Sequence, residues 1–150
     1  MPDRCIDTPL GPMTVTASGG AVTALRWGNG ARDADPLLDE AETQLTAYFS
    51  GRRRGFDLPL QVHASPLVQQ VCAEMRAIPY GETSTYGTIA RTLGTPAQAI
   101  GQACGANPIP ILIPCHRVLA ANGLGGFSGG GGVESKVWLL RHEGAAGLLI

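Results

Sequence analysis

The chain has 150 residues, of which 44% are hydrophobic and 15% are charged. This composition excludes a disordered chain, and the length suits one compact domain or two small lobes that share a core. The formal net charge is -1, which excludes a global basic signature, so any binding to nucleic acid has to use a local patch or groove.

The amino-terminal 60 residues predict a small α/β lobe. Residues 13–17 and 21–27 alternate between apolar and polar side chains or carry β-branched ones, and a Gly-Gly pair separates the two segments. This pattern is typical of a β-hairpin. Asp35-Pro36 is a helix start, and apolar residues then recur at helical spacing until Gly51. We therefore expect residues 1–60 to form one lobe.

Residues 61–150 predict a second lobe that is mainly helical. One helix starts at Ser65-Pro66, two short helices cover residues 86–93 and 97–104, and a last helix covers residues 133–142. The two short helices are joined by a tight turn. The pattern by itself leaves two interpretations open, a DNA-binding helix-turn-helix and an ordinary helical hairpin.

A glycine-rich loop precedes the last helix, and its glycines permit close approach of the backbone to a ligand. Within it, residues 126–130 match the Gly-x-Ser-x-Gly nucleophile elbow of serine hydrolases. That elbow needs a preceding strand and a following helix, whereas both flanks here are rich in glycine and the chain is short for that fold. The pattern therefore disfavours a hydrolase.

The pentapeptide Pro-Cys-His-Arg-Val at residues 114–118 follows an apolar run at residues 109–113. It places a thiol beside an imidazole at the end of a segment expected to be buried. Only the thiolate is a strong nucleophile, so neighbouring groups have to organise removal of its proton. From the residues alone, Cys115 is either such a nucleophile or a small buried apolar side chain.

The four cysteines, at positions 5, 72, 104 and 115, are scattered without Cys-x-x-Cys spacing. This spacing disfavours a disulfide framework or a zinc knuckle and indicates a reducing compartment. No apolar run approaches the ~20 residues needed to cross a bilayer, and no signal-peptide pattern is present. We expect a cytoplasmic protein without a membrane partner.

Five motifs occur together in an order and spacing that one known family shares; they are Thr8–Pro12, Ile78–Thr83, Asn107–Val118, Phe127–Gly130, and Trp138–Leu140 with His142–Gly144. On these residues the chain resembles the O6-alkylguanine-DNA alkyltransferases, also called methylated-DNA–protein-cysteine methyltransferases. The resemblance covers essentially the whole chain and is strongest from about residue 66 to residue 144. It implies an α/β fold, with a small amino-terminal antiparallel sheet lobe and a mainly helical carboxy-terminal lobe (residues 61–150) that contains a helix-turn-helix.

The resemblance also implies the chemistry, which is one irreversible transfer of an alkyl group from O6 of guanine, or O4 of thymine, in DNA to Cys115. It makes His116 the base, Glu143 the acid that orients it, and Tyr86 the donor to guanine N3. Neighbouring side chains on an extended backbone point to opposite faces, so we expect His116 to act on Cys115 through a water molecule. Because a duplex hides O6, the family flips the base out of the helix.

Further roles implied by the resemblance concern binding. Contacts to the substrate are expected from Ser128 at O6, the backbone at Val118, Pro110 in the alkyl pocket, Asn107 stiffening the adjacent turn, and Phe127. Contacts to DNA are expected from Thr95, Ala97, Gln98 and Gly101. The expected partner is DNA containing alkylated guanine, with the protein acting as a monomer and needing no cofactor.

The chain departs from the family at Gln98, which stands where an arginine normally enters the base stack. The zinc ligands of some relatives have no clear counterparts, so we expect no metal. Two alternatives remain open: a repurposed alkyltransferase for an unusual adduct or small electrophile, and a nonenzymatic sensor of alkyl lesions. Relatives of the sensor type lack the cysteine, which is present here.

Overall fold

The computed structural model describes residues 1–127 and 129–145. It opens with an antiparallel sheet of order β1-β2-β3, with β1 at Asp3–Thr8, β2 at Gly11–Ser18 and β3 at Ala21–Trp27. The turn between β2 and β3 is made by Gly19 and Gly20, whose positive φ angles of 60° and 81° are accessible at little cost only to glycine. The predicted hairpin is confirmed, and the sequence patterns missed β1.

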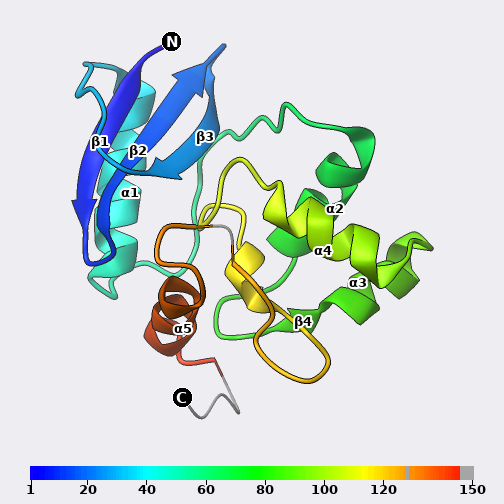
Figure 1. The fold of residues 1–150 in the computed structure, drawn as a ribbon. Helices are drawn as coiled ribbons and strands as arrows, with labels where there is room; N and C mark the ends of the chain where they lie inside the picture. Colours follow the sequence, from blue (N-terminus) through cyan, green and yellow to red (C-terminus); the bar gives the residue numbers. More distant parts are fainter. Residues whose placement is uncertain (128, 146–150) are drawn as a thin grey trace.

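Helix α1, Pro36–Phe49, packs against this sheet (Figure 1). Its start is fixed by Asp35, whose carboxylate accepts hydrogen bonds from the amides of Leu37 and Leu38 at 2.9 and 3.1 Å. Side chains at helical spacing then face the core and are buried: Leu38, Ala41, Leu45 and Tyr48. This face carries Tyr48 into the interior.

The rest of the chain supplies helices α2 (Pro66–Arg76), α3 (Tyr86–Leu93), α4 (Ala97–Gly105) and α5 (Val133–His142). Ser65 and Thr85 cap α2 and α3, and Gly94, with φ 63°, ends α3. Gly94 and the two residues after it lead into α4, which packs against α3. The predicted helices and the α/β fold class are confirmed.

A short parallel pair, β4 (Ser84–Thr85) with β5 (Val118–Leu119), connects the start of α3 to the segment after Cys115. The sequence patterns missed this pair because two-residue strands are too short to show an alternating pattern. The pairing places the first turn of α3 beside the segment Cys115–Arg117, which lies between the sheet and helices α2–α4 in Figure 1.

One hydrophobic core runs through the molecule. It joins buried side chains from both sides of residue 60, among them Met13, Val15, Leu45, Val71, Met75, Ile113 and Leu139. The division into lobes at residue 60 stays a prediction. Within the described ranges, no helix has the length and apolar character that a membrane span requires.

Candidate active site

Cys115 begins a 3₁₀ turn, η1, that covers Cys115–Arg117. The backbone expected to be extended at Cys115 and His116 is therefore helical, and that expectation was wrong. The reason lies just upstream, where the amide of Ile113 bonds back to the carbonyl of Ile109 at 2.9 Å. This tight turn feeds the chain into η1 instead of continuing a strand.

Asn107 holds this turn from both ends. Its amide nitrogen donates to the carbonyl of Ile113 at 2.9 Å, and its amide oxygen accepts from the backbone N–H of Ile109 at 3.0 Å. Inside the turn, buried Ile111 has φ 73°, a strained conformation for a β-branched residue. The bonds from Asn107 stabilise this strained path, which supports the stiffening role implied by the resemblance.

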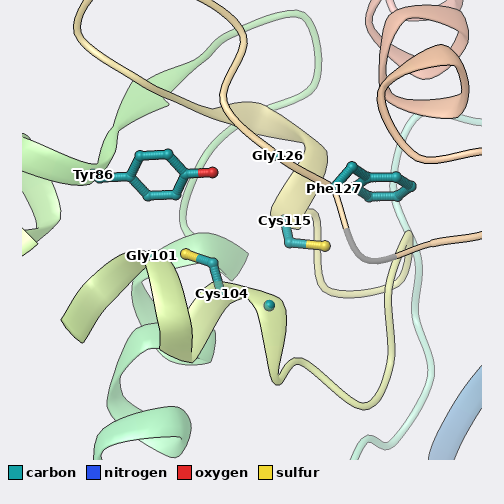
Figure 2. A pocket seen from close by; sticks show the side chains of 7 residues that line it. Tyr86, Gly101, Cys104, Cys115, Gly126 and Phe127 are labelled. Atoms are coloured by element: carbon teal, nitrogen blue, oxygen red, sulfur yellow. The ribbon is translucent and has the colours of Figure 1, made fainter. Parts of the chain in front are cut away.

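Cys115 lies at the wall of a cavity of about 450 Å³. The wall is built by the start of α3, the end of α4, η1 and the glycine-rich loop, through Tyr86, Gly101, Cys104, Gly105, Cys115, Gly126 and Phe127. Figure 2 shows the Tyr86 hydroxyl pointing into the space between the loop that carries Gly126 and the helix that carries Cys104. The cavity therefore brings two thiols, a phenol and an aromatic ring together.

His116, next to Cys115 in the chain, forms a buried pair with Glu143, with 2.8 Å between Nε2 and Oε2. Arg117 binds the same carboxylate through Nε at 2.8 Å and Nη2 at 2.9 Å. Burial alone would raise the pKa of Glu143, but the hydrogen bonds from His116 and Arg117 outweigh it and lower that pKa to about 2. Glu143 is therefore ionised.

His116 is poised as a base. Burial lowers its pKa despite the opposing effect of Glu143, so the ring is neutral. An ionised carboxylate only accepts, so the ring proton lies on Nε2 and the lone pair lies on Nδ1. Within the described residues, Nδ1 is buried and has no hydrogen-bond partner. This free lone pair can receive a proton.

Lys136 is a site residue that the sequence patterns missed. It is fully buried in α5, and its ammonium group donates to the carbonyls of Val118 at 2.7 Å and Gly126 at 3.0 Å. Nζ also lies 5.9 Å from the centre of the Tyr86 ring. The available signal was that the one lysine in the sequence lies inside a helix rich in apolar residues.

Burial raises the pKa of three thiols. At Cys115 the hydrogen bond from Asn107 and the charge of Lys136 act in the opposite direction. Burial raises the pKa of Cys72 to about 11 and that of Cys104 to about 12, and the charge of Lys136 also opposes the rise at Cys104. Cys115 is therefore a thiol at rest, and a base such as His116 has to take its proton when it reacts.

Of the other predicted site residues, some line the cavity and some do not. Phe127 lines it and packs edge-on against Trp27, with ring centres 5.8 Å apart. Pro110 is buried but is not among the lining residues, and the carbonyl of Val118 already accepts from Lys136. Ser128 lies outside the described residues.

The predicted DNA contacts lie around the first turns of α4. Ala97 and Gln98 are exposed, and Thr95 is half-buried in the turn before the helix. Gly101, one turn further on, lines the cavity. The same helix therefore presents its amino-terminal end to solvent and three residues, Gly101, Cys104 and Gly105, to the cavity that holds Cys115. In the described part of the chain, no group of three or more His, Cys, Asp or Glu side chains is arranged to hold a metal ion.

Family models match both parts of the chain. Residues 66–145 match "6-O-methylguanine DNA methyltransferase, DNA binding domain", and residues 3–62 match "6-O-methylguanine DNA methyltransferase, ribonuclease-like domain". These two ranges together cover nearly all of the described residues.

Individual proteins agree with the models. A methylated-DNA–protein-cysteine methyltransferase of Mycobacterium tuberculosis H37Rv is 41% identical over 93% of this chain and 90% of its own length. The constitutive enzyme of Bacillus subtilis is 36% identical over 91% of this chain and 92% of its own length. A crystal structure of Mycobacterium tuberculosis OGT in complex with DNA matches with a TM-score of 0.84 at 41% identity, covering 95% of this chain and 92% of that one. This chain therefore belongs to the 6-O-methylguanine DNA methyltransferase family.

Proposed function

We propose that this protein repairs DNA by transferring an alkyl group directly and irreversibly from O6-alkylguanine, or O4-alkylthymine, to Cys115. One observation carries the proposal: Cys115 lines a cavity and is followed in the chain by a neutral histidine whose Nδ1 is free and whose Nε2 binds an ionised carboxylate. A thiol held this way has a base beside it in the chain and a pocket in which the alkylated base can lie.

The reaction is a substitution at carbon. The proton of Cys115 passes to Nδ1 of His116 through a water molecule. The sulfur forms a bond to the alkyl carbon, the bond from that carbon to O6 breaks, and its electron pair leaves with the base. Tyr86 donates to N3 of the departing guanine, and Glu143 stabilises the charged His116.

The product is a thioether, which is chemically stable. Each protein molecule therefore acts once. We place the substrate in the cavity against Phe127, with Ser128 at O6 and the backbone at Val118 reading the exocyclic amine. Thr95, Ala97 and Gln98 meet the DNA, Gly101 allows close approach, and Pro110 borders the alkyl group. The protein acts as a monomer. Its scattered free cysteines are consistent with the reducing environment of the cytoplasm.

Intact-mass analysis tests the proposal. The protein is incubated with duplex DNA containing O6-methylguanine and, separately, with free O6-benzylguanine. We expect a mass gain of one methyl or one benzyl group, located at Cys115 by peptide mapping, and no gain in Cys115→Ala. Full transfer in Cys115→Ala, or sustained multiple turnover, contradicts the proposal.

A second candidate function is a repurposed alkyltransferase that acts on an unusual adduct or a small electrophile. The exposed position of Gln98 at the start of α4 favours it, because a neutral side chain there gives less attraction to a polyanion. Rapid reaction with the free benzylated base together with no reaction on duplex DNA would support this candidate.

A further inference from the structure

Tyr48, from the amino-terminal part of the chain, contacts the buried pair of His116 and Glu143. It lies in the last turns of α1, is fully buried, and donates a 2.6 Å hydrogen bond to Oε2 of Glu143, 95 residues away in sequence. This is the oxygen that faces His116. The carboxylate that orients the base is therefore held by a side chain from the opposite end of the chain.

The position of this hydroxyl is fixed by packing. The Tyr48 ring contacts four aromatic rings at centroid distances between 5.2 and 6.3 Å, those of Phe49, Phe56, Tyr80 and His142. The backbone carbonyl of Tyr48 is also 2.6 Å from Nε2 of His142, the neighbour of Glu143 in sequence. Tyr48 therefore cannot turn away from Glu143 without repacking this cluster.

Tyr48 also remains a donor at every pH at which the protein is used. Burial and the adjacent charge of Glu143 raise the pKa of its hydroxyl well above the ordinary range. A neutral phenol beside an ionised carboxylate forms a strong, charge-assisted hydrogen bond. Oε2 thus receives hydrogen bonds from three groups, Tyr48, His116 and Arg117.

We propose that Tyr48 is a positioning residue for alkyl transfer, whose hydroxyl holds Glu143 in place and limits how strongly Glu143 binds the Nε2–H of His116. This inference rests on the proposed function. The three donors share the negative charge of Oε2. The hydrogen bond from Tyr48 therefore weakens the attraction between Oε2 and the Nε2–H of His116. The hydroxyl thereby keeps His116 neutral and its Nδ1 free to accept the proton of Cys115.

The other titratable and charged groups around His116 and Glu143 are unchanged when Tyr48 is substituted. They are Arg117, Lys136 and the neutral phenol of Tyr80, and His142 contacts the backbone carbonyl of Tyr48. Deleting the Tyr48 hydroxyl alone leaves Oε2 with more charge for His116. The pKa of His116 then rises, and more of the base is protonated at a given pH.

The variant Tyr48→Phe removes the hydroxyl and keeps the ring. Tyr80→Phe is the matched control, because its hydroxyl donates to the carbonyl of His142 at 3.2 Å and not to Glu143. Two measurements are made on each. The first is the nitrogen-15 and proton NMR spectrum of the His116 side chain, which needs no substrate. The second is the pH dependence of the rate of alkyl transfer to Cys115.

In Tyr48→Phe we expect the Nε2–H resonance of His116 to move downfield, as its bond to Glu143 strengthens. The acidic limb of the rate profile should move to higher pH by about 0.5–1 unit, which lowers the rate on that limb by about 3–10-fold. Tyr80→Phe should move neither. A role limited to packing would lower thermal stability and leave both readouts in place.

Site-specific 3-fluorotyrosine at position 48 retains the packing and makes the hydroxyl a stronger donor. We expect both readouts to move in the direction opposite to Tyr48→Phe, and this variant decides the question if Tyr48→Phe does not fold. Unchanged His116 resonances in both position-48 variants, or equal shifts in Tyr80→Phe, overturn the inference. A wild-type protein that fails to alkylate overturns the proposed function, while the NMR comparison still shows whether Tyr48 tunes His116.

Discussion

The ammonium group of Lys136 lies 2.7 Å from the carbonyl oxygen of Val118. This hydrogen bond joins helix α5 to β5, the strand that follows Cys115–Arg117. Its second hydrogen bond, at 3.0 Å, reaches the carbonyl of Gly126 in the loop that lines the cavity. One buried cation thus ties the strand after Cys115 to the loop that lines the cavity, and its charge acts on Cys115. Burial lowers its pKa to about 8, so the group is still largely charged at neutral pH.

Lys136→Met should slow alkyl transfer to Cys115 about tenfold or more at neutral pH. The substitution keeps a side chain of similar length and removes the charge that favours the thiolate, so the pKa of Cys115 should rise further. The pH dependence of carboxymethylation of Cys115 by iodoacetate measures this change. Arg91→Met, at an exposed position on α3, is the control. Equal profiles for both variants would show that the charge of Lys136 does not act on the thiol.

Acid should unfold the protein partly through Glu143. The pKa of this carboxyl is lowered from 4.5 to about 2 in the folded state, so its contribution is present above pH 4.5 and is lost as pH falls from 4.5 toward 2. A shift of this size corresponds to about 3 kcal/mol in the free energy of unfolding.

Urea denaturation at pH 7, 4 and 3 tests this prediction. Glu143→Gln should already be less stable at pH 7, by about 3–5 kcal/mol, because it leaves Arg117 buried without its counter-charge. It should then lose less stability on acidification than the wild type does. Glu82→Gln, at an exposed carboxyl, should follow the wild type. Parallel losses in wild type and Glu143→Gln would contradict the assignment.

Gly125→Ala should impair alkyl transfer through Tyr86. A methyl group at this position would lie 2.9 Å from the Tyr86 hydroxyl and Cε2, and the backbone there has φ +72°. Tyr86 then has to move away from the cavity, and we expect the transfer rate to fall about tenfold. Gly123→Ala, in the same loop, has no atom within 4 Å of its new methyl group and should react like wild type. Single-turnover rates on O6-methylguanine DNA compare the two.

Gln98→Arg should accelerate repair of duplex DNA and leave the reaction with free O6-benzylguanine nearly unchanged. Flipping a base costs a few kcal/mol, and a long charged side chain that fills the vacated space offsets part of that cost while attracting phosphates. The free base needs no flipping. Parallel single-turnover rates on both substrates measure the difference. Equal acceleration on both would place the limiting step elsewhere, and the glycine-rich loop would be examined next.

Local sequence patterns were sufficient for most of the fold. Helix boundaries depend on capping residues and turn residues that are neighbours in the chain, such as Asp35 before α1 and Gly94 after α3, so their signals can be read directly. The Cys115-His116 pair is likewise visible as adjacent residues, and the family motifs around it led to Glu143.

Contacts between distant segments were decided only by the tertiary structure. The hydrogen bond from Tyr48 to Glu143 spans 95 residues, and the parallel pairing of Ser84 with Val118 depends on how α3 docks. The backbone path at Cys115 was expected to be extended, yet a turn closed between Ile109 and Ile113, and held by Asn107, leads the chain into a 3₁₀ helix. Local sequence patterns do not reveal which buried donor meets which acceptor, because that pairing depends on how the whole core packs.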